Sequence, residues 1–175
     1  MNQFTLQGMI LQTFNRNDSN WAIIKLHDRD IKLFLPDDVD LREFVDMRYA
    51  TIQGKIVGDL NYLTCAILVV EHWEPLIYDE NATSFKHTMT ATITGKVNSY
   101  NHDFLDITCS DINRRLCTKV DLSYCFLLDN YLSKDMDVDL SLSLRYDREI
   151  GSNIVTVDEL TIMKQDHVMT MEQQV

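Results

Sequence analysis

The sequence predicts an all-β protein made of two tandem five-stranded β-barrels, and three observations lead to this prediction. Short segments of alternating apolar residues run along most of the 175-residue chain, which is the pattern of half-buried strands. Clusters of Asn and Asp separate these segments, and with 5 Gly and 2 Pro in the whole chain they must form most of the turns. The pattern also occurs twice, since Gly8-Met9-Ile10 is followed 87 residues later by Gly95-Lys96-Val97.

Two further landmarks support the duplication. Asp46-Met47 recurs as Asp135-Met136, 89 residues on, and Asp40-Leu41 recurs as Asp121-Leu122, 81 residues on. The unequal spacings indicate that loops of the two copies differ in length. Each copy has the same predicted order of three strands, a helical segment and two more strands.

In the first copy, Phe4, Leu6 and Ile10 begin the alternation, and Pro36 ends the third strand because proline cannot donate to a sheet ladder. Asp40 has the position of a helix N-cap, with Glu43 three residues later as in a capping box. We expect Gly54 to mark a bulge or a bend. The predicted elements are strands at 4–14, 21–26, 31–35, 47–57 and 62–72, and a helical turn at 40–45.

The second copy repeats this order with a longer helix. The predicted elements are strands at 88–99, 104–109, 115–120, 135–146 and 153–163, and a helix at 122–132 with Asp121 as N-cap. The expected organisation is therefore barrel 1 over 1–75, a linker over 76–87, barrel 2 over 88–164 and a flexible tail over 165–175.

The charge of the chain is strongly acidic. It has 16 Lys and Arg against 27 Asp and Glu, a net charge of −11, and the excess is shared by both copies. A polyanion is repelled at long range by such a surface, although acidity also serves plain solubility. No apolar run approaches the roughly 18 residues of a membrane span, and the N-terminus does not read as a signal peptide. We expect a cytoplasmic protein, or one inside a host cell, that is not secreted and has no membrane partner.

Chemistry-bearing motifs are absent from the sequence. The four Cys have no C-x-x-C spacing, so we interpret them as reduced, packed thiols. No phosphate-binding glycine loop and no H-E-x-x-H or G-x-S-x-G motif occurs. We expect no catalytic activity, no metal and no cofactor.

Part of the first copy resembles a known family. The resemblance rests on three segments, which are Gly8-Met9-Ile10, Asn20-Trp21-Ala22-Ile23-Ile24-Lys25-Leu26 and Tyr49-Ala50-Thr51-Ile52-Gln53-Gly54-Lys55-Ile56. Over residues 6–72 the chain resembles the OB-fold barrels at the N-termini of some helicases and in single-strand-binding proteins. The second copy matches by strand order only. The resemblance implies an OB-like fold and an ability to bind single-stranded nucleic acid.

OB-folds bind single strands with aromatic side chains and a basic groove. The candidate face, for nucleic acid or for a protein partner, consists of Trp21, Lys25, Lys32, Phe34, Tyr49, Lys55, Tyr62 and Trp73. The competing interpretation is that Trp21 and Phe34 belong to the core and that the lysines form an ordinary solvated surface.

The acidic surface suggests a different function. Asp135, Asp137 and Asp139 are spaced to lie on one face of a strand, where they could dock on a basic groove or simply solubilise the strand. On charge, the sequence favours a non-catalytic adaptor or inhibitor that docks on nucleic-acid-processing proteins. Single-stranded nucleic-acid binding is the alternative. Self-association through apolar residues of 122–132 stays open.

Overall fold

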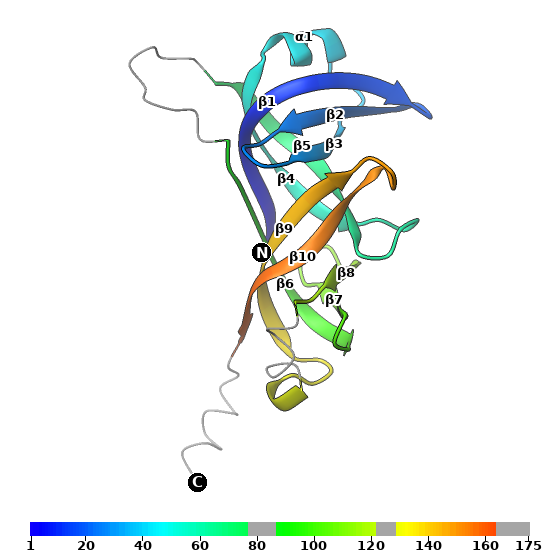
Figure 1. Ribbon diagram of the computed structural model, residues 1–175, viewed down its shortest axis with the longest axis vertical. Coiled ribbons are helices and arrows are strands. Elements are labelled where there is room, and N and C mark those ends of the chain that lie inside the picture. The colour runs from blue at the N-terminus through cyan, green and yellow to red at the C-terminus, as the bar shows by residue number, and fades with distance from the viewer. Residues whose placement is uncertain (77–86, 122–128, 164–175) are drawn as a thin grey trace.

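The computed structural model describes residues 1–76, 87–121 and 129–163. Within these ranges the protein is all-β, with ten strands, the short helix α1 and a helical turn at 129–131 (Figure 1). No helix in these ranges has the length and apolar character needed to cross a bilayer. The all-β prediction is confirmed.

The elements of the first half lie close to their predicted positions. Asp40 is the N-cap of α1, as predicted, and its side chain accepts hydrogen bonds from the backbone N–H groups of Arg42 and Glu43. The elements are β1 (Asn2–Arg16), β2 (Ser19–Lys25), β3 (Asp30–Leu35), α1 (Leu41–Asp46), β4 (Tyr49–Gly58) and β5 (Cys65–Pro75).

The second half has β6 (Met89–Tyr100), β7 (Phe104–Cys109), β8 (Arg115–Lys119), β9 (Asp137–Asp147) and β10 (Ser152–Ile162). The helix predicted over 122–132 falls mostly on residues outside the described ranges, and so do the predicted tail and most of the predicted linker.

Strand pairing closes each half into a ring. In the first half β1 pairs with β2, β2 with β3, β3 with β5, β5 with β4, and β4 with β1 again. Only the β3–β5 pairing is parallel. The second half repeats the scheme in the order β6, β7, β8, β10, β9 and back to β6, and its one parallel pairing, β8–β10, is the equivalent one.

The two rings also share their irregularities at a constant spacing of 87 residues. The β1–β2 register shifts at Leu11, and the β6–β7 register shifts at Asn98. The β4–β5 pairing skips Glu71 near Gly54, where a bulge or a bend was predicted, and the β9–β10 pairing skips Asp158. Since bulges are specific backbone features, their repetition shows that both halves use one strand plan.

The halves are joined by strand pairing as well as by the chain. Strand β1 runs antiparallel to β6, with Phe4 opposite Ala91, and β5 runs antiparallel to β10, with Ala66 opposite Asn153. In both pairs the partners are 87 residues apart and thus occupy equivalent positions of the two copies. An internal pseudo-two-fold axis therefore passes through both contacts, as in an isologous dimer, and all ten strands belong to one hydrogen-bonded sheet.

One apolar cluster fills the interior of both rings, with Phe4, Ile52 and Ile56 in the first half and Ile93, Val97 and Val138 in the second, all at most 1% exposed. The Asn2 side chain lies buried at the junction, where it donates to the Ile56 carbonyl at 2.7 Å and accepts from the Ile56 N–H at 2.8 Å.

Asn and Asp side chains stabilise the turns, as the low glycine content requires. Asn101 accepts from the backbone N–H groups of Asp103 and Phe104. Asp147 accepts from those of Glu149 and Ile150. These local bonds shape the loops at the ends of the strands. One of these loops, the β9–β10 turn, contacts Lys32 of the first half.

Candidate functional site

Three of the candidate residues meet on the outer face of β2 and β3. Trp21 and Phe34 are cross-strand partners, and their rings form an edge-to-face pair with centroids 5.1 Å apart. The Lys32 ammonium lies 4.1 Å from the centre of the Trp21 ring, a cation–π distance. Ala22 and Leu33, their chain neighbours, are fully buried on the other face. Alternation thus turns Trp21, Lys32 and Phe34 away from the core, where all three are partly exposed.

The same outer row continues onto β5 and β4. Phe34 lies opposite Val69, and Val69 lies opposite Lys55. Lys55 points across the junction between the halves and forms an ion pair of 3.7 Å with Asp111, in the loop after β7. Because both partners are more than a third exposed, this pair contributes little to stability.

The β9–β10 hairpin of the second half covers part of this face. The Lys32 ammonium donates to the Gly151 carbonyl at 2.8 Å, and the Lys32 N–H donates to Asn153 Oδ1 at 2.8 Å. Ile23, which lies opposite Lys32, is only 3% exposed although it lies on the outer face. The open part of the face is therefore the end that carries Trp21 and Phe34.

The pKa of Lys32 is affected by its burial beneath the β9–β10 hairpin. Burial lowers the pKa of Lys32 below its ordinary value of 10.5, the charge of Arg16 lowers it further, and Asp59 partly opposes the change. Arg16 is exposed at the end of β1. It adds a second cation to the Trp21 end of the face.

Lys25 and Tyr49 lie further round the same ring. Each is the cross-strand partner of Met9, Lys25 from β2 and Tyr49 from β4. The Tyr49 ring meets the His87 ring edge-to-face at 6.1 Å. Lys25 is exposed.

Two predicted residues lie away from this face. Trp73 is near the end of β5, where it packs edge-to-face on Phe44 of α1 at 6.3 Å and remains 37% exposed. Tyr62 is in the loop between β4 and β5, is 47% exposed, and lines a hollow together with residues of the second half.

The acidic residues do not all lie on one strand. Asp137 and Asp139 lie on the outer face of β9, where Asp137 pairs with Lys96 at 3.0 Å and Asp139 accepts a hydrogen bond from the Thr94 hydroxyl. Asp135 precedes the strand, in a turn, with φ of 69°. The predicted row of three is thus a pair, because β9 begins two residues later than the predicted strand.

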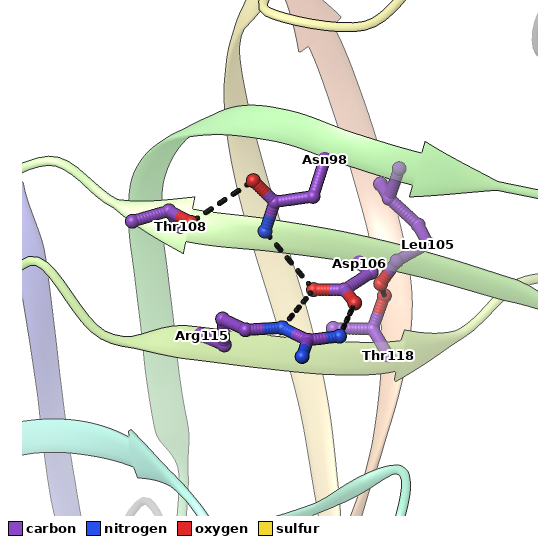
Figure 2. A network of polar contacts seen from close by, with 6 residues as sticks. All are labelled: Asn98, Leu105, Asp106, Thr108, Arg115 and Thr118. Atoms are coloured by element: carbon purple, nitrogen blue, oxygen red, sulfur yellow. Dashed lines mark hydrogen bonds and ion pairs between the residues drawn. The ribbon is translucent and has the colours of Figure 1, made fainter.

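Sequence reasoning also missed a polar cluster in the second half. Arg115 of β8 bonds to Asp106 of β7, Asn98 of β6 donates to Asp106, and the Thr108 hydroxyl donates to Asn98 (Figure 2). Their pattern carries no recognisable motif.

For the covered part of the β2–β3 face, the sequence does hold one signal. Residues Trp21 to Ile24 are apolar at every position, whereas a strand open on one face alternates between apolar and polar residues.

The described cysteines are free thiols whose pKa values are raised. Cys65, Cys109 and Cys117 are free, and burial is the main cause that raises the pKa of each thiol, that of Cys109 to about 11. Across the described ranges, no three or more His, Cys, Asp or Glu side chains gather as metal ligands would.

No protein-family model and no curated protein sequence matches the chain. Among solved structures, the chain is similar to the single-stranded DNA binding protein from Thermus aquaticus, with a TM-score of 0.62 and 11% identity over 94% of each chain. A deletion mutant of that protein matches with a TM-score of 0.59 and 11% identity, over 95% of this chain and 96% of the other. At this identity the likeness concerns the fold, and it confirms the OB-fold resemblance first seen in residues 6–72.

Proposed function

We propose that this protein binds single-stranded nucleic acid and has no catalytic role. In this proposal the two strand rings are two OB-like barrels, with the predicted boundaries, and the Trp21 end of the outer β2–β3 face is the main contact. The strand 2–3 face and the loops beside it are where OB-folds bind oligonucleotides.

One observation carries the proposal, namely the Trp21–Phe34 pair, whose partly exposed rings lie 5.1 Å apart on that face. A base can stack on an exposed aromatic ring whatever its identity, because every base has a π-face. Arg16 places an exposed cation at the same end, where a nucleic-acid strand needs partners for its phosphates, and the Lys32 ammonium lies against the Trp21 ring. The similar fold of a single-stranded DNA binding protein supports the same function.

The net charge of −11 opposes binding at long range, so the local cations must outweigh a repulsive background. We therefore expect modest affinity that falls as salt rises. For single strands the slope of log K against log salt is about −0.7 for each phosphate neutralised. A Lys25→Gln variant should reduce this slope if Lys25 contacts the strand.

The test uses fluorescence anisotropy of a labelled oligothymidylate at low and moderate salt. Trp21→Ala should weaken binding by about 5- to 100-fold, the equivalent of about 1–3 kcal/mol for one lost base stack. The matched control is Trp73→Ala, because Trp73 is the other tryptophan and lies at the α1 end, and it should leave affinity within about twofold.

Trp21→Phe preserves an aromatic ring and serves where the alanine variant folds poorly. It should retain most of the affinity. Absence of binding by the unmodified protein at low salt, or equal losses for Trp21→Ala and Trp73→Ala, would overturn the proposal.

The acidity of both halves favours a second candidate, an adaptor or inhibitor that occupies the basic groove of a nucleic-acid-processing protein. Asp137 and Asp139 on β9 would contribute to that docking face. In this case the protein should displace an oligonucleotide from a basic single-strand-binding domain without binding the oligonucleotide itself. Asp139→Asn should weaken the displacement.

A further inference from the structure

Arg115 of β8 has an exposed head held by a buried acid. The side chain of Arg115 is 74% exposed, whereas that of Asp106 is 11% exposed. The Arg115 Nε donates to Asp106 Oδ1 at 3.3 Å, and Nη2 donates to Asp106 Oδ2 in a second, shorter contact. The two bonds form a fork, which fixes both the position and the plane of the guanidinium.

The acid is itself held by neighbouring strands, as Figure 2 shows. Asn98 of β6 donates to Asp106 Oδ1 at 3.1 Å, and the Thr108 hydroxyl donates to Asn98 Oδ1 at 3.0 Å. Asn98 is the bulge residue of β6, so the bulge aims its amide at Asp106. The network thus leads from a buried carboxylate to a guanidinium at the surface.

Stability alone is a weak reason for this arrangement. An exposed arginine gains little from an ion pair in water, yet a pre-oriented guanidinium loses less entropy when it binds a ligand. The Arg115 Nη1 makes no hydrogen bond to any residue in the described ranges, so donors remain for a ligand. Asp106 also raises the pKa of Arg115, and the head stays charged.

The loop between β4 and β5 of the first half forms the facing wall. A hollow of ≈ 200 Å³ lies between this loop and β8, and it is lined by Tyr62, Leu63, Asp106 and Arg115. The approach is close, since a Cβ on Gly58 would lie 2.4 Å from the Arg115 carbonyl oxygen. Tyr62 is 47% and Leu63 68% exposed, so an aromatic ring and an aliphatic side chain border the same hollow as the guanidinium.

Asp59 and Cys117 also line the hollow. Asp59 repels an anion, a repulsion that the Arg115 guanidinium must outweigh; the Asp59 carboxylate is held by the Ser152 hydroxyl at 2.7 Å and the Asn61 N–H at 2.9 Å. Burial raises the pKa of the Cys117 thiol, so at neutral pH it adds no charge.

We propose that Arg115 and Tyr62 form a composite nucleotide subsite between the two halves, in which the guanidinium binds a phosphate and the base lies against the Tyr62 ring. Asp106 is a positioning residue. This inference rests on the proposed function. It adds a second contact, beyond the Trp21 face, for the same bound nucleic-acid strand. Planar arginine forks match phosphate oxygens in two-point contacts, and aromatic rings stack on any base.

The experiment measures oligothymidylate affinity for Arg115→Gln beside the matched control Arg114→Gln. Arg114 is the exposed neighbour, so both variants lose the same charge. Arg115→Gln should weaken binding by about 5- to 20-fold, and Arg114→Gln by about twofold or less. Arg115→Lys keeps the charge without the fork and should fall between them, and Tyr62→Ala should match Arg115→Gln.

A direct readout separates failure of the subsite from failure of the proposed function. The Nε–H resonance of Arg115 should shift on titration with a thymidine dinucleotide, and inorganic phosphate should shift it less because no base can stack. If Trp21→Ala abolishes binding while the Arg115 and Arg114 variants behave alike, the subsite is wrong and the proposed function stands. If the unmodified protein binds no oligonucleotide but the dinucleotide shifts the resonance, the subsite stands and the proposed function is wrong. An unshifted resonance at saturating dinucleotide overturns the subsite.

Discussion

The side-chain amide of Asn153 pairs with both backbone groups of Lys32. Its Oδ1 accepts from the Lys32 N–H at 2.8 Å, and its Nδ2 donates to the Lys32 carbonyl at 2.8 Å and to the Ala66 carbonyl at 3.1 Å. Asn153 is 2% exposed and lies opposite Ala66 on the pseudo-two-fold axis. One buried amide thus joins β10 to β3 and β5 of the other half, and on β3 it does so at Lys32, a residue of the candidate face.

Asn153→Ala should therefore loosen the junction between the halves. The substitution leaves buried backbone groups without partners, at about 1–3 kcal/mol for each, so the free energy of unfolding should fall by about 2–4 kcal/mol. Urea denaturation measures the change. Asn61→Ala, at an exposed turn position, is the control and should stay within about 0.5 kcal/mol. Equal effects of the two variants would show that the Asn153 bonds are not needed at the junction.

Gly54→Ala should be among the most damaging substitutions in the first half. A Cβ at this position would lie 1.9 Å from the Val69 carbonyl oxygen and 2.9 Å from the Phe4 ring, so backbone must move. We expect a loss of more than about 3 kcal/mol or failure to fold, measured as soluble yield and melting temperature.

Gly151→Ala is the comparison for that result. Gly151 has φ of +81°, but no atom lies within 4 Å of an added Cβ, so only the backbone conformation is penalised, by about 1 kcal/mol. A Gly54→Ala protein as stable as Gly151→Ala would contradict the close approach of β4 and β5.

The depressed pKa of Lys32 has a consequence for stability at high pH. The unfolded chain holds the Lys32 proton up to its ordinary pKa of 10.5, while the folded protein releases it at lower pH. Between the two pKa values the unfolded state binds more protons, so stability rises with pH through that interval.

The unmodified protein should therefore gain stability relative to Lys32→Met as pH increases towards about 10.5. Urea denaturation at several pH values measures the difference, and groups common to both proteins cancel. If the stability of the unmodified protein relative to Lys32→Met fell as pH rose, the pKa of Lys32 would be raised in the folded protein, and the prediction would be wrong.

Cys109 should resist thiol reagents in the folded protein. With a pKa of about 11 the thiolate is about one part in a thousand at pH 8, and the residue is 1% exposed. Disulfide-exchange labelling followed by peptide mass mapping should find Cys109 unmodified in buffer and modified in urea. Labelling in buffer at the rate of a free thiol would mean that β7 opens readily.

Local chemistry let the sequence determine most of the elements. Alternation of side chains over two residues predicts strands such as 104–109 without knowledge of their neighbours, and Asp40 caps α1 because the bonds it makes lie within three residues. The repeat of Gly8 at Gly95 likewise predicted that the halves share one plan. The apolar run from Trp21 to Ile24 is typical of a strand covered on both faces, but the sequence prediction did not use this signal.

Only the tertiary structure decided what covers that strand and which residues meet. Lys32 and Asn153 are 121 residues apart in the chain, and Asp106 and Tyr62 line one hollow only because the two halves meet there. Such contacts depend on the pairing of β1 with β6 and of β5 with β10, and the side-chain period of a strand is the same whichever neighbour it pairs with. The sequence therefore determined two copies of a β-fold and a set of candidate residues. The pseudo-two-fold packing decided which of them stay open to a ligand, because it places the β9–β10 hairpin of the second half against β3 at Lys32.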